Sequence, residues 1–218
     1  SILRELANLH NLEQAPDRTY YYGFIPKRTY GLAGLGYKPG NAAVGFDVPN
    51  NPTSAREVMT HELGHNLSLP HADCGGPSGP DPQYPYPNAY LGGAGRYIWG
   101  YLADTASYVD PRRTDIHDLM SYCRGETFSD YNYRKMQLHL EQIDAQFRIE
   151  ASMSAAAGPQ ELLLISGSVD EAGKAELSPL TSLVGKVRAA KEGPYTLRIT
   201  VADRVVEHLF ATSTLDHS

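Results

Sequence analysis

The chain of 218 residues lacks several features that define large classes of proteins. No apolar run approaches the length of a bilayer-spanning helix, which excludes membrane insertion. Its net charge is −6 and no basic face is visible, which argues against a nucleic-acid partner. Tryptophan and phenylalanine are scarce, at 1 and 5 residues, whereas tyrosine occurs 15 times. The aromatic side chains are therefore mostly polar.

Cysteine is also scarce. Cys74 and Cys123 are the only two, and their spacing alone leaves open two free thiols or one disulfide. The sequence begins at Ser1 without a visible signal peptide, so we expect a mature form or an excised part of a longer protein. With 20 glycines and 15 prolines the chain is rich in loops. Its length permits one domain, or a medium domain with a small appendage.

A helix is predicted to begin near Ser54, because Ser54 and Glu57 stand at the spacing of a capping box after Pro52. It should continue to about residue 67. Apolar residues recur in it at every fourth position, and this stripe is expected to be buried against a sheet. The stripe consists of Met59, Leu63 and Leu67.

The other elements follow from periodicity and from turn residues. We expect a helix at 1–10, strands at 19–25, 41–48 and 96–103, and a long helix at 130–147 capped by Ser129. The glycine-rich segment 31–40 is interpreted as a loop, and 74–100 as a long irregular excursion. Beyond residue 151, short strand-like segments alternate with turns. This pattern predicts a small antiparallel module after a boundary near 151–159.

The predicted helix from Ser54 contains the residues of a metal site. His61 and His65 are four residues apart, so both imidazoles project from one face and can reach one tetrahedral metal. Glu62 flanks that face, where a carboxylate can take a proton from metal-bound water. Pro70 prevents smooth continuation of the helix, so a turn can bring His71 as a third ligand. An open zinc position of this kind predicts peptide hydrolysis.

Two segments resemble a known family. Residues 61–71, HELGHNLSLPH, resemble the extended zinc signature HExxHxxGxxH of metzincin metalloproteases, and residues 118–122, DLMSY, resemble their Met-turn. The resemblance covers roughly residues 1–150 and implies three histidine ligands, a general base and a methionine beneath the metal. These are His61, His65 and His71, then Glu62, then Met120. Ser68 replaces the family's turn glycine, so we expect Ser68 at positive φ or a helix end shifted by one residue.

Two further assignments depend on this resemblance. Tyr122 resembles the tyrosine of astacins and serralysins that acts as a switchable fifth ligand, and a buried hydroxyl bound to a neighbouring group is the alternative. Cys74 and Cys123 each lie three residues after a residue of the site, namely His71 and Met120. We therefore predict a disulfide between them, which would place the protein outside the cytosol.

The remaining polar residues are interpreted without a catalytic role. Five histidines are expected on the surface or in the core rather than at the metal, namely His10, His117, His139, His208 and His217. A charged cluster is expected to be a solvated loop, consisting of Asp110, Arg112, Arg113, Asp115 and Asp118. Nine of the tyrosines fall between Tyr84 and Tyr133, and we interpret them as lining a cleft.

The expected fold is α+β. A metzincin-like zinc protease domain at 1–150, without the first strand that such domains generally have, precedes a small β-sandwich-like module at 151–218. The expected function is that of a secreted, zinc-dependent endopeptidase acting on extracellular proteins or glycoproteins, similar to bacterial metzincins with β modules. The strand at 41–48 is expected to pair with an extended peptide. The alternative is a secreted binding or adhesion protein with a structural zinc site. Calcium is compatible with the resemblance, but no residue pattern defines its site.

Overall fold

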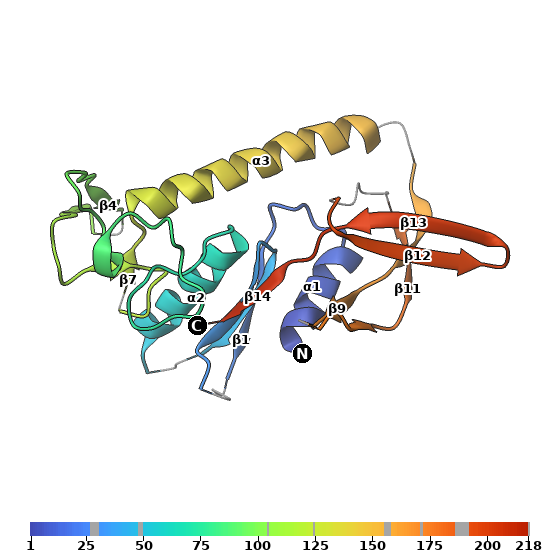
Figure 1. Ribbon diagram of the computed structural model, residues 1–218, viewed down its shortest axis with the longest axis horizontal. Coiled ribbons are helices and arrows are strands. Elements are labelled where there is room, and N and C mark those ends of the chain that lie inside the picture. Colours follow the sequence, from blue (N-terminus) through green and yellow to red (C-terminus); the bar gives the residue numbers. More distant parts are fainter. Residues whose placement is uncertain are drawn as a thin grey trace.

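The computed structural model describes residues 1–26, 31–47, 50–103, 105–123, 125–154, 158–170, 172–185 and 192–217. Three α-helices and one short 3-10 helix lie among them: α1 (Ile2–Leu12), α2 (Pro52–Asn66), η1 (Pro87–Ala89) and α3 (Asp130–Ser154). Helix α3 runs along the top of the molecule in Figure 1, from the end that holds α2 towards the end that holds the later strands. No helix of the described ranges is both long enough and apolar enough to span a bilayer.

A mixed sheet of four strands lies between α1 and α2 (Figure 1). Its order is β1 (Tyr21–Ile25), β3 (Ala42–Phe46), β2 (Gly34–Lys38) and β14 (Thr214–His217). Strands β1 and β3 are parallel, whereas β2 is antiparallel to β3 and β14 is antiparallel to β2. Residues of β3 alternate between the two faces, so Val44 joins a core with Leu3 of α1 while Gly45 faces Val58 of α2.

Two predictions about this sheet are wrong. Segment 31–40 is not a loop, because residues 34–38 form β2. Its glycines allow β2 to approach α2: a Cβ on Gly34 would lie 2.5 Å from Glu62 Oε1, and one on Gly36 would lie 2.9 Å from the Glu62 carbonyl oxygen. The strand expected at 41–48 was predicted to pair with an extended peptide, which requires a position at the edge of the sheet. It is not at an edge, because β3 lies between β1 and β2.

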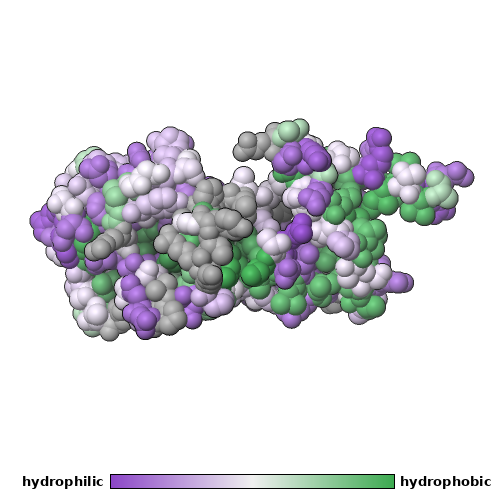
Figure 2. Space-filling model, turned by 90° about the horizontal axis from the view of Figure 1, so that it is seen from below, coloured by the Kyte–Doolittle hydropathy of each residue, from purple (hydrophilic) through white to green (hydrophobic). Residues whose placement is uncertain are grey.

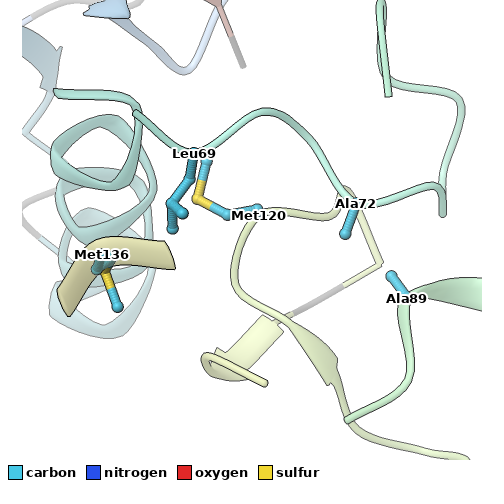
Figure 3. Close-up of a cluster of buried hydrophobic side chains, with 5 residues drawn as sticks. All are labelled: Leu69, Ala72, Ala89, Met120 and Met136. Atoms are coloured by element: carbon cyan, nitrogen blue, oxygen red, sulfur yellow. The ribbon is translucent and has the colours of Figure 1, made fainter. Parts of the chain in front are cut away.

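The segment between α2 and α3 is mostly irregular, and two apolar clusters anchor it. One consists of Leu69, Ala72, Ala89, Met120 and Met136 (Figure 3), and the other of Leu91, Val109 and Ile116. Short strands pair within this segment: β4 (Gly100–Leu102) with β5 (Ser107–Val109), and β6 (His117–Asp118) with β7 (Gly125–Thr127). The strand expected at 96–103 is thus shorter than predicted.

Helix α3 begins where the sequence predicts. The Ser129 hydroxyl oxygen accepts a hydrogen bond of 3.3 Å from the Asn132 amide, which confirms Ser129 as a cap. The helix continues to Ser154, beyond the expected end at 147. The predicted boundary at 151–159 includes residues 155–157, which lie outside the described residues.

The later strands pair two by two. These strands are β8 (Gln160–Leu164) with β11 (Thr181–Gly185), β9 (Gly167–Val169) with β10 (Ala175–Leu177), and β12 (Tyr195–Val201) with β13 (Arg204–Phe210). Among the described side chains of residues 158–214, none is a buried hydrophobic one. After β13 the chain returns to the first sheet, where β14 lies beside β2 (Figure 1).

Candidate metal centre

Helix α2 begins two residues earlier than predicted. Asn51 is its N-cap, with the side-chain oxygen accepting a hydrogen bond of 3.1 Å from the Ser54 amide, so the prediction of Ser54 as cap is wrong. Pro52 occupies the first turn, where its missing N–H costs nothing. The buried residues of α2 are His61, Glu62, Gly64, His65 and Asn66, whereas the apolar stripe expected to be buried is only half-buried. The helix thus buries its polar, chemically functional side chains.

Three histidines come together as predicted. One nitrogen from each of His61, His65 and His71 lies within 4.8 Å of the others. The ring centroids are 4.7–5.2 Å apart, and all three side chains are buried, with His65 and His71 completely so. Three imidazoles at this spacing can hold one divalent transition metal and leave a further coordination position open.

Each imidazole is oriented by a backbone carbonyl that accepts a hydrogen bond from Nδ1. The acceptors are Leu119 for His61 at 2.7 Å, Leu69 for His65 at 2.8 Å, and Ser78 for His71 at 2.9 Å. Because a carbonyl oxygen only accepts, Nδ1 carries the proton and the lone pair lies on Nε2. This bonding fixes the tautomer that a metal-ligating histidine needs.

The turn after α2 delivers His71. Ser68 has φ +70°, which confirms the predicted positive φ at the position where the metzincin signature has glycine. The Leu69 amide donates to the Gly64 carbonyl at 3.0 Å, and this hydrogen bond closes the end of the helix. The Leu69 side chain is completely buried, and its carbonyl accepts the hydrogen bond from His65. One turn therefore orients His65 and redirects the chain towards His71.

The segments that carry the third ligand and Tyr122 are joined side by side. The Ala72 amide donates to the Met120 carbonyl, and the Tyr122 amide donates to the Cys74 carbonyl, each at 2.9 Å. A disulfide links Cys74 to Cys123, which confirms the predicted pairing. Closing a loop across 49 residues stabilises the fold by about 4 kcal/mol in the chain-entropy model.

Tyr122 lies over the histidine cluster. Its hydroxyl oxygen is 3.4 Å from His71 Nε2, and its ring centroid is 5.1 Å from that of His71 and 5.9 Å from that of His61. The residue is 38% exposed, and its hydroxyl contacts a neighbouring group, so the alternative of a hydroxyl held by such a group stays open beside the ligand role. The hydroxyl faces the nitrogen that would bind the metal, and its role as a ligand stays a prediction.

Glu62 is completely buried between α2 and β2. Two neighbours that the sequence analysis did not single out shape its surroundings. Gly34 leaves room for the carboxylate, and Tyr22 of β1 lies close enough that burial and the charge of Glu62 together raise the pKa of its phenol. The sequence of β1, YYGFI, does not indicate which of its tyrosines faces α2, so the position of Tyr22 could not be predicted.

Met120 packs beneath α2. It is completely buried beside Leu69 (Figure 3), and a Cβ on Gly64 would collide with its sulfur atom. Gly64 is therefore the residue that permits the approach of α2 to this methionine. The predicted position of Met120 beneath a metal ion, as the methionine of a Met-turn, stays a prediction.

Asp118 organises the turn around Met120, and its inclusion in a solvated loop is wrong. The carboxylate is completely buried and accepts hydrogen bonds of 2.8, 2.7 and 2.9 Å from the Met120 amide, the Ser129 amide and the Asn132 side chain. Burial raises the pKa of Asp118, and these hydrogen bonds oppose the rise. The turn so held presents the Leu119 carbonyl to His61. The rest of the predicted cluster forms the exposed ion pairs Asp110–Arg112 and Asp115–Arg113.

The tyrosines between 84 and 133 do not act as one lining. Two of them bridge distant segments, because the Tyr86 hydroxyl donates to Asp130 and the Tyr131 hydroxyl donates to Asp81. The Tyr84 hydroxyl donates to the nearby Tyr90 carbonyl. Others are exposed, including Tyr97, Tyr101, Tyr108 and Tyr133. Hydrogen bonds from tyrosine hydroxyl groups thus stabilise a segment that has little secondary structure.

The histidines expected to lie elsewhere are placed as follows. His10 is completely buried, and its ring is hydrogen-bonded to the Asn41 side chain at 2.9 Å. His117 donates from Nδ1 to the Asn88 carbonyl at 2.8 Å. His208 lies on β13 with an exposed side chain, and the side chain of His217 lies outside the described residues.

Three buried histidines with a buried carboxylate beside them form the kind of centre that metallopeptidases use. The family model for peptidase M66 matches residues 27–142, more than half of the chain, and the chain belongs to this metallopeptidase family. The match includes all three histidines, Glu62, Met120 and Tyr122. Neither the curated proteins nor the solved structures yielded a match.

Proposed function

We propose that this peptidase is a zinc-dependent endopeptidase of metzincin type that cleaves extracellular polypeptides. The observation that carries the proposal is the cluster of His61, His65 and His71, whose ligand nitrogens lie within 4.8 Å of one another. Each ring is held through Nδ1 by a carbonyl group, as metal-ligating histidines require. A zinc ion bound there would polarise the scissile carbonyl group and make a water molecule acidic enough to react at neutral pH.

The residues around the histidines have separate tasks in this proposal. Glu62 acts as the general base: buried beside the histidine face, its carboxylate takes the proton of the attacking water and delivers it to the leaving amine. Tyr122 would donate its hydroxyl hydrogen to the oxygen on which negative charge develops, or bind the metal when substrate is absent, and its contact of 3.4 Å with His71 Nε2 supports this role. Met120 and Asp118 support the site from below.

The metzincin assignment is supported by two features. Ser68 at φ +70° turns the chain so that His71 joins the two helical histidines, as the family's glycine would. Met120 packs against Gly64 in the last turn of the histidine helix, between His61 and His65 in the sequence. The disulfide between Cys74 and Cys123 supports an extracellular location, because such bonds persist in oxidising compartments.

The substrate is expected to bind as an extended strand beside β2. This strand, rather than β3, lies directly over Glu62, through Gly34 and Gly36. Main-chain pairing on the side of β2 that faces away from β3, where β14 lies in this structure, would place a scissile bond near the histidines without requiring a particular side chain. Pairing of this kind suits cleavage within a polypeptide.

The test compares Glu62→Gln with Glu57→Gln, a control five residues earlier on the same helix. We expect Glu62→Gln to keep one zinc ion per chain while kcat/KM for an unfolded protein substrate falls about a thousandfold. Glu57→Gln should keep the zinc ion and the wild-type kcat/KM. A chelator should abolish wild-type cleavage, and added zinc should restore it. A wild-type protein that binds zinc yet cleaves nothing in a mixed peptide library would instead support the binding-protein alternative.

A further inference from the structure

The edge of the sheet beside the metal centre is already paired with a strand of the same chain. Strand β14 runs antiparallel to β2, with Thr214 opposite Lys38 and Asp216 opposite Gly36. The Thr214 hydroxyl also donates to the Lys38 carbonyl at 2.8 Å. These contacts join positions about 180 residues apart, and β14 follows immediately after the exposed β12–β13 hairpin (Figure 1).

The register identifies which backbone groups of β2 face β14. The Phe46 amide donates to the Ala33 carbonyl, so residue 33 points its backbone groups towards β3, and by alternation so do residues 35 and 37. Residues 34, 36 and 38 therefore point theirs towards β14. The hydrogen-bonded pairs with β14 are then Gly36 with Asp216 and Lys38 with Thr214, in agreement with the hydroxyl contact at Lys38.

This paired edge borders the general base of the proposed reaction. A Cβ on Gly36 would lie 2.9 Å from the Glu62 carbonyl oxygen, 3.2 Å from Glu62 Oε2 and 3.5 Å from His65 Cβ. The partner of Gly36 in β14 is Asp216. Asn66 fixes β2 against α2, because its side-chain amide donates to the Tyr37 and Ala42 carbonyls at 2.9 Å. The position of β14 is thus the position of an extended chain next to the catalytic side chains.

We propose that β14 is an internal competitor of the substrate: it occupies the edge of β2 on which a polypeptide substrate pairs, and it must leave before a substrate can bind. This inference rests on the proposed endopeptidase function. The pairing is short, with four residues in β14, and Thr214 at its start is exposed. Short edge pairings open at low free energy. Release of β14 therefore adds a modest, adjustable barrier to substrate binding.

Its orientation supports competition with a chain rather than with a small ligand. The strand is antiparallel to β2 and contributes main-chain groups, as a peptide does when it adds to a sheet edge. A substrate that pairs with residues 34, 36 and 38 would need the same N–H and C=O groups. Both chains cannot hold them at once.

The test removes one N–H from β14 in the full-length protein. Asp216→Pro loses the amide that faces Gly36, whereas Leu215→Pro introduces the same residue where the amide points away from β2. Asp216→Ala keeps the amide and removes only the carboxylate. For a fluorogenic peptide library with zinc present, we expect Asp216→Pro to lower KM about fivefold with kcat unchanged, the factor for one hydrogen bond of about 1 kcal/mol. The two controls should keep the wild-type KM.

Hydrogen exchange supplies a readout that does not depend on activity. The amides of Gly36 and Lys38 should exchange slowly in the wild type and both controls, and faster in Asp216→Pro, while the α2 amides stay protected in all four proteins. If the wild type is active and Asp216→Pro has the same KM and the same exchange rates, β14 does not compete with the substrate. The proposed endopeptidase function would be unaffected by that result. If Asp216→Pro exchanges faster at Gly36 and Lys38 but neither it nor the wild type cleaves any peptide, the proposed endopeptidase function is contradicted. The role of β14, which rests on that function, is then contradicted as well.

Discussion

The two parts of the chain solve the problem of burial differently. Residues 1–146 enclose polar side chains almost completely, including Glu62, His71, Asp118 and Asn132. Residues 158–214 form pairs of strands whose large apolar side chains stay exposed, such as Leu177 at 62% and Val184 at 76%. Figure 2 shows apolar residues gathered over the end of the molecule that these strands form.

This difference indicates where the stability of the fold resides. In the first part, each buried polar group depends on partners that the fold must supply, so removal of one partner leaves others unsatisfied. In the second part, side chains are already in contact with water, and their removal should change little. Matched substitutions in the two parts test this view.

The largest difference is expected for two aspartates. Asp118→Ala should lower the free energy of unfolding by about 3 kcal/mol, because three buried donors lose their acceptor. Asp170 accepts one hydrogen bond of 2.8 Å from the Lys174 amide in an exposed turn, and Asp170→Ala should cost less than about 1 kcal/mol. Urea unfolding of the metal-free proteins measures both. Similar losses at the two positions would refute the comparison.

A smaller difference is expected for two ion pairs. Lys135 lies 2.8 Å from the buried Asp81, whereas Arg198 and Glu207 pair across β12 and β13 with both side chains exposed. Lys135→Met should cost about 1–2 kcal/mol at pH 7, and Arg198→Met about 0.5 kcal/mol or less. Both losses are measured by urea unfolding at fixed ionic strength.

The stability lost in Lys135→Met should depend on pH in a defined direction. Burial alone would raise the pKa of Asp81, but the hydrogen bonds from Lys135, the Gln83 amide and Tyr131 outweigh it and lower the pKa. A lowered carboxyl pKa stabilises the fold above the unfolded value of about 3.9 and ceases to do so as the pH falls through the folded value. The gap between wild type and Lys135→Met should therefore narrow below about pH 4. A gap of constant size from pH 7 to pH 3 would count against this linkage.

The cluster of three histidines was predictable because its pattern is local. The spacing of His61 and His65 on one helix, and the break at Pro70, contain the information that brings three imidazoles together. The disulfide was predictable because Cys74 and Cys123 stand at equal distances from two residues of the same site. In each case a few neighbouring positions determine the outcome.

Residues whose role depends on distant contacts were not predictable in the same way. Gly34 and Gly36 resemble loop glycines until the approach of α2 is known. Asp118 resembles its charged neighbours until Ser129 and Asn132 are seen to surround it. The return of β14 to β2 follows from no local pattern, because it joins segments about 180 residues apart in the sequence.

Backbone strain provides the one respect in which the two parts should behave alike. Ser68 after α2 has φ +70°, and Ala202 between β12 and β13 has φ +51°. Glycine relieves the strain of about 1–2 kcal/mol at such a position but makes the unfolded chain more flexible, so Ser68→Gly and Ala202→Gly should each stabilise the fold by about 0.5–1 kcal/mol. Thermal unfolding of the two variants tests this equality. Because the strain arises within a single residue, burial of the surroundings should not alter it, and a gain at only one of the two positions would contradict this view.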